Sequence, residues 1–313
     1  MFNPSIPPAA SDSPEELADW LEYTALLAAD RDTSIWDLAR ILNRSGSTDV
    51  VDDPEDAEHT DPGIDDVSYP FAERAFAAVE ERYRSCGENG EAYPFELGES
   101  FIRLRRGGAN FAYTFLLLLS AKMAQAPPQK EAIALFDDLA SAAAANYLGA
   151  PQPGVGSAVF GFPRRMLARQ FPKALDDLCN QMGEGVSHVD RPRTKAQKDA
   201  KLDVVAWRHF ADGRAGKLIA FGQCATGANW RSKLTELQPK NFIRLWMREA
   251  PVVDPLRMFF TPERVEQNLW LETTVNGGIL FDRCRIAALA PTTGPISTKC
   301  GVLAAELLQK LAA

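Results

Sequence analysis

The sequence predicts a mixed α/β protein in which a helical N-terminal domain precedes a domain of both strands and helices. In the first half, apolar residues recur mostly at spacings of three and four, the period of an amphipathic helix. After residue 160, short apolar runs bounded by turn residues alternate with helical stretches, which is typical of strands connected by helices. These two observations predict the class α/β, of the α+β type.

Composition and cysteine usage restrict the class of protein further. The chain has 313 residues, of which 46% are hydrophobic and 24% charged, an ordinary globular balance. No apolar run approaches the roughly 20 residues of a membrane-spanning helix, and the N-terminus does not resemble a secretory signal. The five cysteines never form C-x-x-C, and there are only three histidines, which argues against a zinc site. We therefore expect a cytoplasmic protein without membrane association.

The net charge of −8 conceals a difference between the two halves of the chain. Residues 1–160 contain 11 basic and 27 acidic residues, whereas residues 161–313 contain 23 basic and 15 acidic residues. This asymmetry indicates a site for a polyanion in the second half. The simpler alternative is that the basic residues only face solvent.

The N-terminal half is predicted to contain helices and one acidic loop. The acidic segment 45–68 has two Asp-Pro breakers and is expected to be a flexible loop; a DNA-mimicking or autoinhibitory strip is the alternative. A Gly/Pro cluster at 149–156 suggests a boundary between domains 1–155 and 156–313. The expected helices span residues 14–43, 70–89, 95–125 (one or two helices) and 129–148.

The second half is predicted to alternate between helices and strands. Two apolar runs separated by the turn ADGRAG are expected to pair as a hairpin. The expected strands are 202–207, 217–224 and 256–261, with further strands near 186–189 and within 278–289. The expected helices are 164–182, 229–237, 242–248 and 262–270.

The hairpin carries the polar residues that point to chemistry. Asp203 lies at the start of an apolar strand, where a carboxylate is costly unless it is paired, hydrogen-bonded or bound to a metal. Strand alternation places Gln223 and Ala225 on one face and Cys224 on the other, so Cys224 is expected in the core. If Asp203 and Gln223 meet at the sheet edge, their oxygens would suit Mg²⁺.

These residues resemble a known family. The stretch "LDVVAW…KLIAFGQCATG" is similar to the core of the PD-(D/E)XK, or restriction-endonuclease-like, nucleases. It most resembles the Mrr-like branch, in which a "GxD" strand is followed by "Q-x-K". The preceding "FPKALDDLCNQMG" is similar to the "FExLVxxLLxxxG" helix of that branch, and the resemblance covers about residues 164–262. The positions shared with that helix are Phe171, Ala174, Leu175, Leu178 and Gly183.

The resemblance implies a fold and an activity. The fold would be an αβββαβ core with a central mixed sheet, and the activity would be DNA cleavage with Mg²⁺ or Mn²⁺. Asp203 would be a metal ligand, Gln223 the second ligand through its side-chain oxygen, and the Cys224 carbonyl a third. The role implied is that of an effector in bacterial restriction or anti-phage defence. The N-terminal domain would then bind a regulatory or sensor protein or a second copy of the chain.

Two positions depart from the family pattern. Pro172 stands where the helix often has a glutamate, and Asp176, one turn further, is a possible substitute. Ala225 stands where the catalytic lysine is expected, and loss of such a group typically costs on the order of 10²–10⁴-fold in rate. A natural inactive relative would explain this alanine, as would an engineered Lys→Ala substitution. We favour the second explanation as a hypothesis.

Other residues are candidate auxiliary ligands or nucleic-acid contacts. Asp199 could assist a metal or simply form a salt bridge, and each basic candidate could equally be a solvated surface charge. The choice between DNA and RNA stays open, as does a non-catalytic nucleic-acid-binding or scaffolding subunit, or an interaction protein with an accidental motif. The candidate contacts are Thr226, Asn229, Trp230, Lys233, Arg164, Arg165 and Lys198.

Overall fold

The computed structural model describes residues 7–28, 30–46, 68–105, 110–121, 130–187 and 198–312. The chain divides into two compact units, the first made of Met1–Pro127 with Gly301–Ala313 and the second of Pro128–Cys300. The predicted boundary after residue 155 differs from this division. The reason is that helix α5 (Lys130–Tyr147) packs on strands of the second unit, so the Gly/Pro cluster is a loop within that unit. Most of the predicted acidic loop 45–68 lies outside the described residues, as do residues 188–197.

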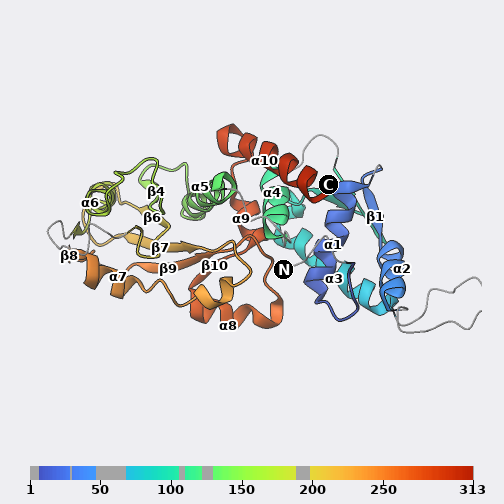
Figure 1. Cartoon of the computed structure of the whole chain (residues 1–313). Coiled ribbons are helices and arrows are strands. Elements are labelled where there is room, and N and C mark those ends of the chain that lie inside the picture. Colours follow the sequence, from blue (N-terminus) through green and yellow to red (C-terminus); the bar gives the residue numbers. More distant parts are fainter. Residues whose placement is uncertain are drawn as a thin grey trace, which may run out of the picture. The chain divides into compact units, whose positions relative to one another are not determined.

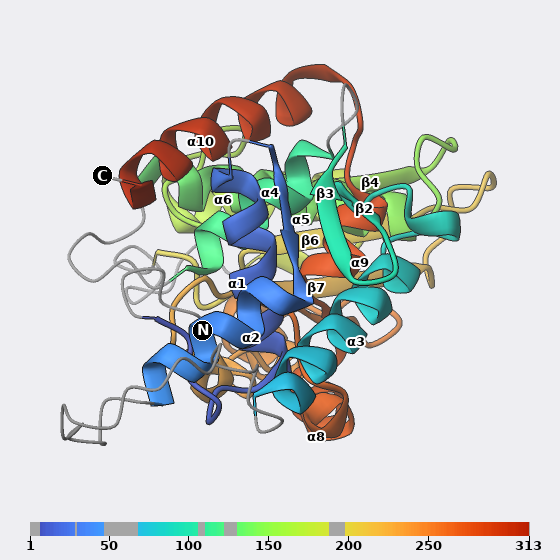
Figure 2. The ribbon, with the colours of Figure 1, turned by 90° about the vertical axis from the view of Figure 1, so that its right-hand side faces the viewer.

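The first unit combines helices with a small sheet. Its three-stranded sheet is antiparallel, in the order β1–β3–β2 (Figure 2). The helix predicted over 95–125 is therefore correct only for its second part, because the first part forms two strands. The alternating exposed and buried residues of β3 fit a strand with one face on the core. The elements are α1 (Pro14–Leu27), β1 (Asp32–Ser34), α2 (Ile35–Gly46), α3 (Tyr69–Ser85), η2 (Glu88–Gly90), β2 (Phe95–Leu97), β3 (Phe101–Leu104) and α4 (Phe111–Ser120).

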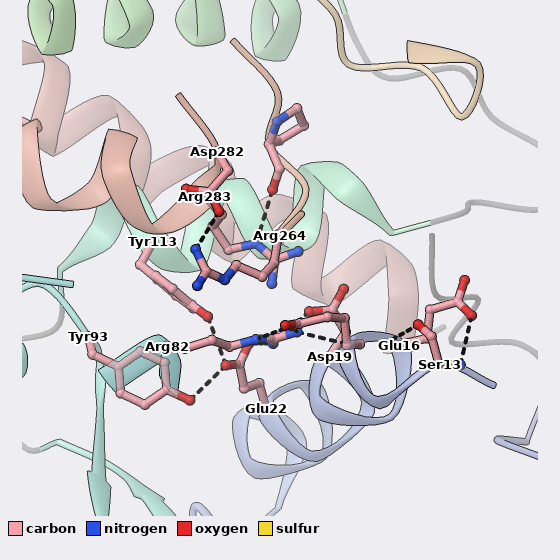
Figure 3. A network of polar contacts seen from close by, with 12 residues as sticks. Ser13, Glu16, Asp19, Glu22, Arg82, Tyr93, Tyr113, Arg264, Asp282 and Arg283 are labelled. Carbon is pink, nitrogen blue, oxygen red and sulfur yellow. Dashed lines mark hydrogen bonds and ion pairs between the residues drawn. The ribbon is translucent and has the colours of Figure 1, made fainter. Parts of the chain in front are cut away.

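A buried ionic cluster lies in the core of the first unit. The guanidinium of Arg82, on α3, is fully buried and forms ion pairs with three carboxylates of α1 (Figure 3). The phenol hydroxyls of Tyr93 and Tyr113 each donate to Glu22 at 2.7 Å. Burial by itself would lower the pKa of Arg82. The negative charges of the carboxylates together raise it by more, so the pKa is well above its ordinary value. The three carboxylates belong to Glu15, Asp19 and Glu22.

The second unit is built on a five-stranded mixed sheet in the order β10–β9–β7–β6–β4 (Figure 1). The pairing of β6 with β7 is antiparallel and places Val205 opposite Phe221, so the predicted hairpin is confirmed. β4 adds to β6 antiparallel, β9 is parallel to β7, and β10 is parallel to β9. The strands are β4 (Val155–Val159), β6 (Val204–Arg208), β7 (Leu218–Cys224), β9 (Leu256–Phe260) and β10 (Ile279–Phe281).

Helices cover the sheet on both faces. On one face, α6 (Phe171–Met182) and α7 (Pro239–Trp246) pack on alternate residues of β6 and β7, in an apolar cluster. On the other face lies α5, which also contacts α9 (Arg283–Leu289). α6 ends at Gly183, whose φ of 64° is the left-handed conformation that glycine adopts at little cost. The remaining elements are β5 (Val186–Ser187), η4 (Trp230–Lys233), β8 (Met247–Glu249), α8 (Gln267–Gly277) and α10 (Gly294–Ala312).

Among the described residues, no helix is both long enough and apolar enough to cross a membrane.

Candidate functional site

Asp203 is held at the point where β6 begins. Its main-chain N–H donates to the carbonyl of Gly222 at 2.9 Å, which continues the β6–β7 ladder by one bond. The next acceptor for β7 is the Asp203 carboxylate itself, because its Oδ2 accepts from the Cys224 N–H at 2.8 Å. The side chain thus replaces a main-chain acceptor at the end of the ladder. This fixes its position without an ion pair.

A second carboxylate lies beside the first. Asp137 comes from α5, and one oxygen of each carboxylate lies close to Gly161, in the loop after β4. A β-carbon placed on Gly161 would be 3.2 Å from Asp203 Oδ1 and 3.5 Å from Asp137 Oδ2. A side chain at this position would therefore crowd the acid pair, which the glycine avoids. No described residue forms an ion pair with either carboxylate.

Without a bound metal ion, the surroundings of the acid pair favour its protonated form. Burial raises the pKa of Asp137 to about 7, an increase that the charges of Asp138 and Asp199 reinforce and that the Cys224 thiol and Arg165 oppose. Burial also raises the pKa of Asp203 well above its ordinary value, and the charge of Asp137 raises it further. Two carboxylates in this arrangement can share a proton or bind a cation.

Cys224 belongs to this site rather than to the apolar core. Its side chain is partly exposed, and its thiol is hydrogen-bonded to the carboxylate of Asp137. Burial and the charges of Asp137 and Asp203 raise the pKa of the thiol well above its ordinary value. The prediction that Cys224 is a core residue is therefore corrected. The raised pKa keeps the sulfur protonated, which makes it a poor nucleophile.

Gln223 bonds to partners different from those of Asp203. It is 3% exposed and lies on the face of β7 that α6 and α7 cover. Its Oε1 accepts from the Leu237 N–H at 3.2 Å, and its Nε2 donates to Glu236 at 2.9 Å. The predicted metal ligand is thus engaged with the segment that leads into α7, and its role as a ligand stays a prediction.

Lys201 interacts with Glu236, the partner of Gln223, and also affects Asp203. Lys201 Nζ is 3.1 Å from Glu236, and its positive charge lowers the pKa of Asp203 against the stronger effect of burial. Its backbone adopts a φ of 70°, and Ala200 before it a φ of 54°. A side-chain oxygen of Asp199 accepts from the Lys201 N–H at 3.0 Å, which supports this unusual turn. Two consecutive left-handed residues other than glycine indicate a backbone held in place by its surroundings.

Ala225 lies in an apolar environment. It is 2% exposed and belongs to a cluster that includes Trp230 and Phe259. Phe259, the pairing partner of Gln223 on β9, is in this cluster, as expected if Gln223 and Ala225 lie on one face. A lysine at this position would begin inside an apolar cluster and would need to extend out of it.

The predicted nucleic-acid contacts fall into two groups. Three of them have structural partners: Trp230 is fully buried, Arg164 is buried and donates to the Arg169 carbonyl, and Arg165 pairs with Asp138. The burial of Trp230 and Arg164 fits a packing role, and a role of either residue in nucleic-acid binding stays a prediction. The others are exposed or partly exposed, namely Thr226, Asn229, Lys233 and Lys198.

The predicted auxiliary acids are placed differently from each other. Asp176, on α6, accepts a hydrogen bond from the Ser187 hydroxyl of β5. Asp199 lies close enough to Asp203 and Asp137 for its charge to raise the pKa of both. Only Asp199 is therefore associated with the acid pair through the interactions of the described residues.

The sequence prediction missed Asp137, although a signal for it exists. Ala140, Ser141 and Ala144 follow Asp137 at spacings of three, four and seven, and all three are buried. Asp137 is therefore a carboxylate on the buried stripe of an Ala-rich helix, which is costly without a function or a partner.

Comparison with known proteins adds no further assignment. No protein-family model matches the chain, and neither a curated protein nor a solved structure matches it. Among the described residues, no group of three or more histidine, cysteine, aspartate or glutamate side chains is arranged to hold a metal ion. The acid pair beside Gly161 is the feature of the second unit from which a function can be argued.

Proposed function

We propose that the second unit is a metal-dependent phosphodiester hydrolase that acts on DNA at the Asp137–Asp203 pair. The observation that carries the proposal is that carboxylate oxygens of Asp137, on α5, and of Asp203, at the start of β6, both lie beside Gly161. Mg²⁺ is commonly bound in proteins by one or two carboxylates, with waters and substrate phosphate oxygens completing its shell. The acid pair fits this requirement, and Mn²⁺ takes similar oxygen ligands.

The order of elements supports the proposal. α5, β4, β6, β7, α7 and β9 follow one another as α-β-β-β-α-β, with three antiparallel strands and a fourth parallel to the third. This is the order that the resemblance to restriction-endonuclease-like nucleases implies. α6, whose sequence resembles a helix of the Mrr-like branch, lies between the first two of these strands, so in this order α5 and not α6 is the leading helix.

The residues of the site have separate roles in the proposed reaction. A bound divalent ion would supply Lewis-acid activation of water and offset charge on the phosphate. Asp203 is oriented by the Cys224 N–H, so its free oxygen is directed before any ligand arrives. Asp137 would be the second carboxylate ligand of that ion, and the bound cation would lower its pKa from the value of about 7 that it has in the metal-free chain. Lys201, whose charge already acts on Asp203, would provide the positive charge that Ala225 cannot.

A specific observation favours a second candidate function, nucleic-acid binding without hydrolysis. Ala225 is packed among apolar side chains, and both ends of the Gln223 amide are engaged. If Lys201 does not replace the missing lysine, the chain would retain the fold and lose most of the rate. The roles in restriction or anti-phage defence, and in binding a regulatory partner through the first unit, belong to the proposal on the same basis of resemblance.

The test compares cleavage by the full chain with cleavage by variants of the acid pair. We expect slow nicking of plasmid DNA with Mn²⁺ or Mg²⁺, lost on adding EDTA and reduced at least tenfold in Asp203→Asn and in Asp137→Asn. Asp212→Asn is the matched control, because Asp212 lies in the exposed β6–β7 turn. Equal nicking by wild type and Asp203→Asn would contradict the proposal.

The Ala225→Lys variant separates the two candidate functions. If an engineered substitution removed the lysine, its return should raise the cleavage rate on the order of 10²–10⁴-fold, and adding Asp203→Asn should abolish the gain. DNA binding without cleavage in both forms would favour the non-catalytic function. Thermal unfolding of Ala225→Lys is measured in parallel, because a buried ammonium destabilises a core.

A further inference from the structure

An exposed aromatic residue follows the glycine that lies beside the acid pair. Phe162 follows Gly161, the residue beside the two carboxylates, and is 45% exposed. Two nearby residues in the sequence, Phe160 and Phe171, are by contrast at most 1% exposed, and their rings pack edge to face with centroids 5.5 Å apart. The second unit therefore buries these two rings and leaves that of Phe162 exposed.

The loop that carries Phe162 is anchored on both sides. The Arg164 guanidinium lies over the Phe160 ring at 4.5 Å and donates to the main-chain carbonyls of Arg169 and Lys198. Arg165 donates to the Ala134 carbonyl of α5 at 2.9 Å. These bonds fix the loop to α5 and to the segment before β6, so the exposed ring sits on a fixed backbone.

A positive charge accompanies the ring. Lys198 is exposed, and its Nζ lies 5.9 Å from the centroid of Phe162. Arg169, at the end of the same loop, is also exposed. An aromatic face with cations beside it is complementary to a ligand that has a flat ring and a negative charge, which describes a nucleotide.

We propose that Phe162 is a stacking platform for an unpaired base, with Lys198 binding a phosphate of the same strand, so that the preferred substrate of the acid-pair site is single-stranded or locally melted nucleic acid. This inference rests on the proposed function, because it names the substrate form for that site. A base in an intact duplex already has both faces covered by its neighbours, and stacking on a protein ring requires an unpaired or extruded base. Duplex DNA would gain little from the ring.

Binding is tested with the full chain in EDTA, so that it is measured without cleavage. Fluorescence anisotropy is recorded with a labelled 20-nucleotide single strand, with the same strand in a duplex, and with the RNA version of the strand. We expect Phe162→Leu to weaken single-strand binding roughly 5- to 100-fold and Phe162→Trp to retain it, with duplex binding changed less than twofold. Lys198→Gln should lower the slope of log affinity against log salt concentration by about 0.7.

Phe210→Leu is the matched control. Phe210 is 65% exposed in the turn after β6, at the opposite end of that strand from Asp203. Equal losses in Phe162→Leu and Phe210→Leu would overturn the inference. So would equal losses for duplex and single strand, or the absence of any oligonucleotide binding by wild type, which would favour a protein partner on Phe162.

Failure of the stacking platform can be distinguished from failure of the proposed hydrolysis at the acid pair. Asp203→Asn should reduce cleavage at least tenfold and leave the effect of Phe162→Leu on single-strand binding unchanged. Binding that depends on Phe162, in a chain that never cleaves, would support the platform and contradict hydrolysis. Cleavage that depends on Asp203 while single-strand binding ignores Phe162 would overturn the platform alone.

Discussion

The two units both place carboxylates out of full contact with water, but they balance them in different ways. In the first unit, Arg82 supplies a buried positive charge to Glu15, Asp19 and Glu22, and the Arg82 pairs with Asp19 and Glu22 are 2.8 and 2.9 Å long (Figure 3). In the second unit, no described residue forms an ion pair with Asp137 or Asp203. The difference shows which cluster is complete within the protein and which one can take up a proton or a cation.

The largest expected effect comes from removing the buried cation. Arg82→Met leaves the carboxylates of α1 without their guanidinium and should lower the free energy of unfolding by about 3–5 kcal/mol. Urea unfolding, with hydrogen exchange measured on α1 and α3, checks this. The control is Arg84→Met on the same helix, because Arg84 and Glu80 are exposed and their pair should contribute under about 0.5 kcal/mol. Similar losses in the two variants would contradict the assigned difference.

Replacing an acid of the Asp137–Asp203 pair should stabilise the fold, the opposite of the effect expected for replacing Arg82. The pKa of Asp137 is about 7 when folded, against 3.8 as its ordinary value, so the folded chain holds a proton that the unfolded chain releases between these pH values. The stability that this proton provides is present below about pH 4 and is lost as the pH rises through 7. In EDTA, Asp137→Asn should therefore raise the free energy of unfolding by about 4 kcal/mol at pH 8 relative to wild type, and by little at pH 4.

Two further measurements separate the effect of removing a charge in general from the effect of a bound metal ion. Asp212→Asn should leave the pH dependence of unfolding unchanged. Adding Mg²⁺ at pH 8 should stabilise wild type more than Asp137→Asn, because a ligand that binds only the folded chain shifts unfolding by mass action. A wild-type curve with the same pH slope as Asp137→Asn would show that Asp137 does not carry the raised pKa.

Much of the local structure could be predicted because it depends on patterns within a short stretch. The β6–β7 hairpin follows from two apolar runs around a turn, and α6 follows from its apolar stripe and the glycine that ends it. The strands β2 and β3 were predicted as helix, since strands of three and four residues have too few positions to show an alternating pattern. Their pairing with β1, from a distant part of the sequence, decides their conformation.

The candidate site could be predicted only in part, because it combines distant segments. Asp203 was identified from its place at the start of an apolar strand. Asp137 lies on a helix that the predicted boundary assigned to the other domain, so its approach to Asp203 could not be read from spacing. The partners of Gln223 could not be predicted either, because Leu237 is brought to it by the turns that follow β7.

The smallest expected effect concerns Gln223, whose amide is satisfied by neutral and acidic partners. Gln223→Leu removes the acceptor of the buried Leu237 N–H and should lower the free energy of unfolding by about 1–2 kcal/mol. Gln223→Glu keeps an acceptor but places a negative charge beside Glu236, and should cost a similar amount at pH 8 and less at pH 4. Urea unfolding at the two pH values measures both.

The same Gln223→Glu variant determines whether Gln223 belongs with the acid pair. If it only joins β7 to the segment before α7, Mg²⁺ affinity measured by calorimetry should change less than twofold, because the new carboxylate bonds away from Asp203. A ligand position would behave differently, since exchanging an amide oxygen for a carboxylate strengthens binding of a hard divalent cation. A gain of tenfold or more would instead place residue 223 in the metal site together with Asp137 and Asp203.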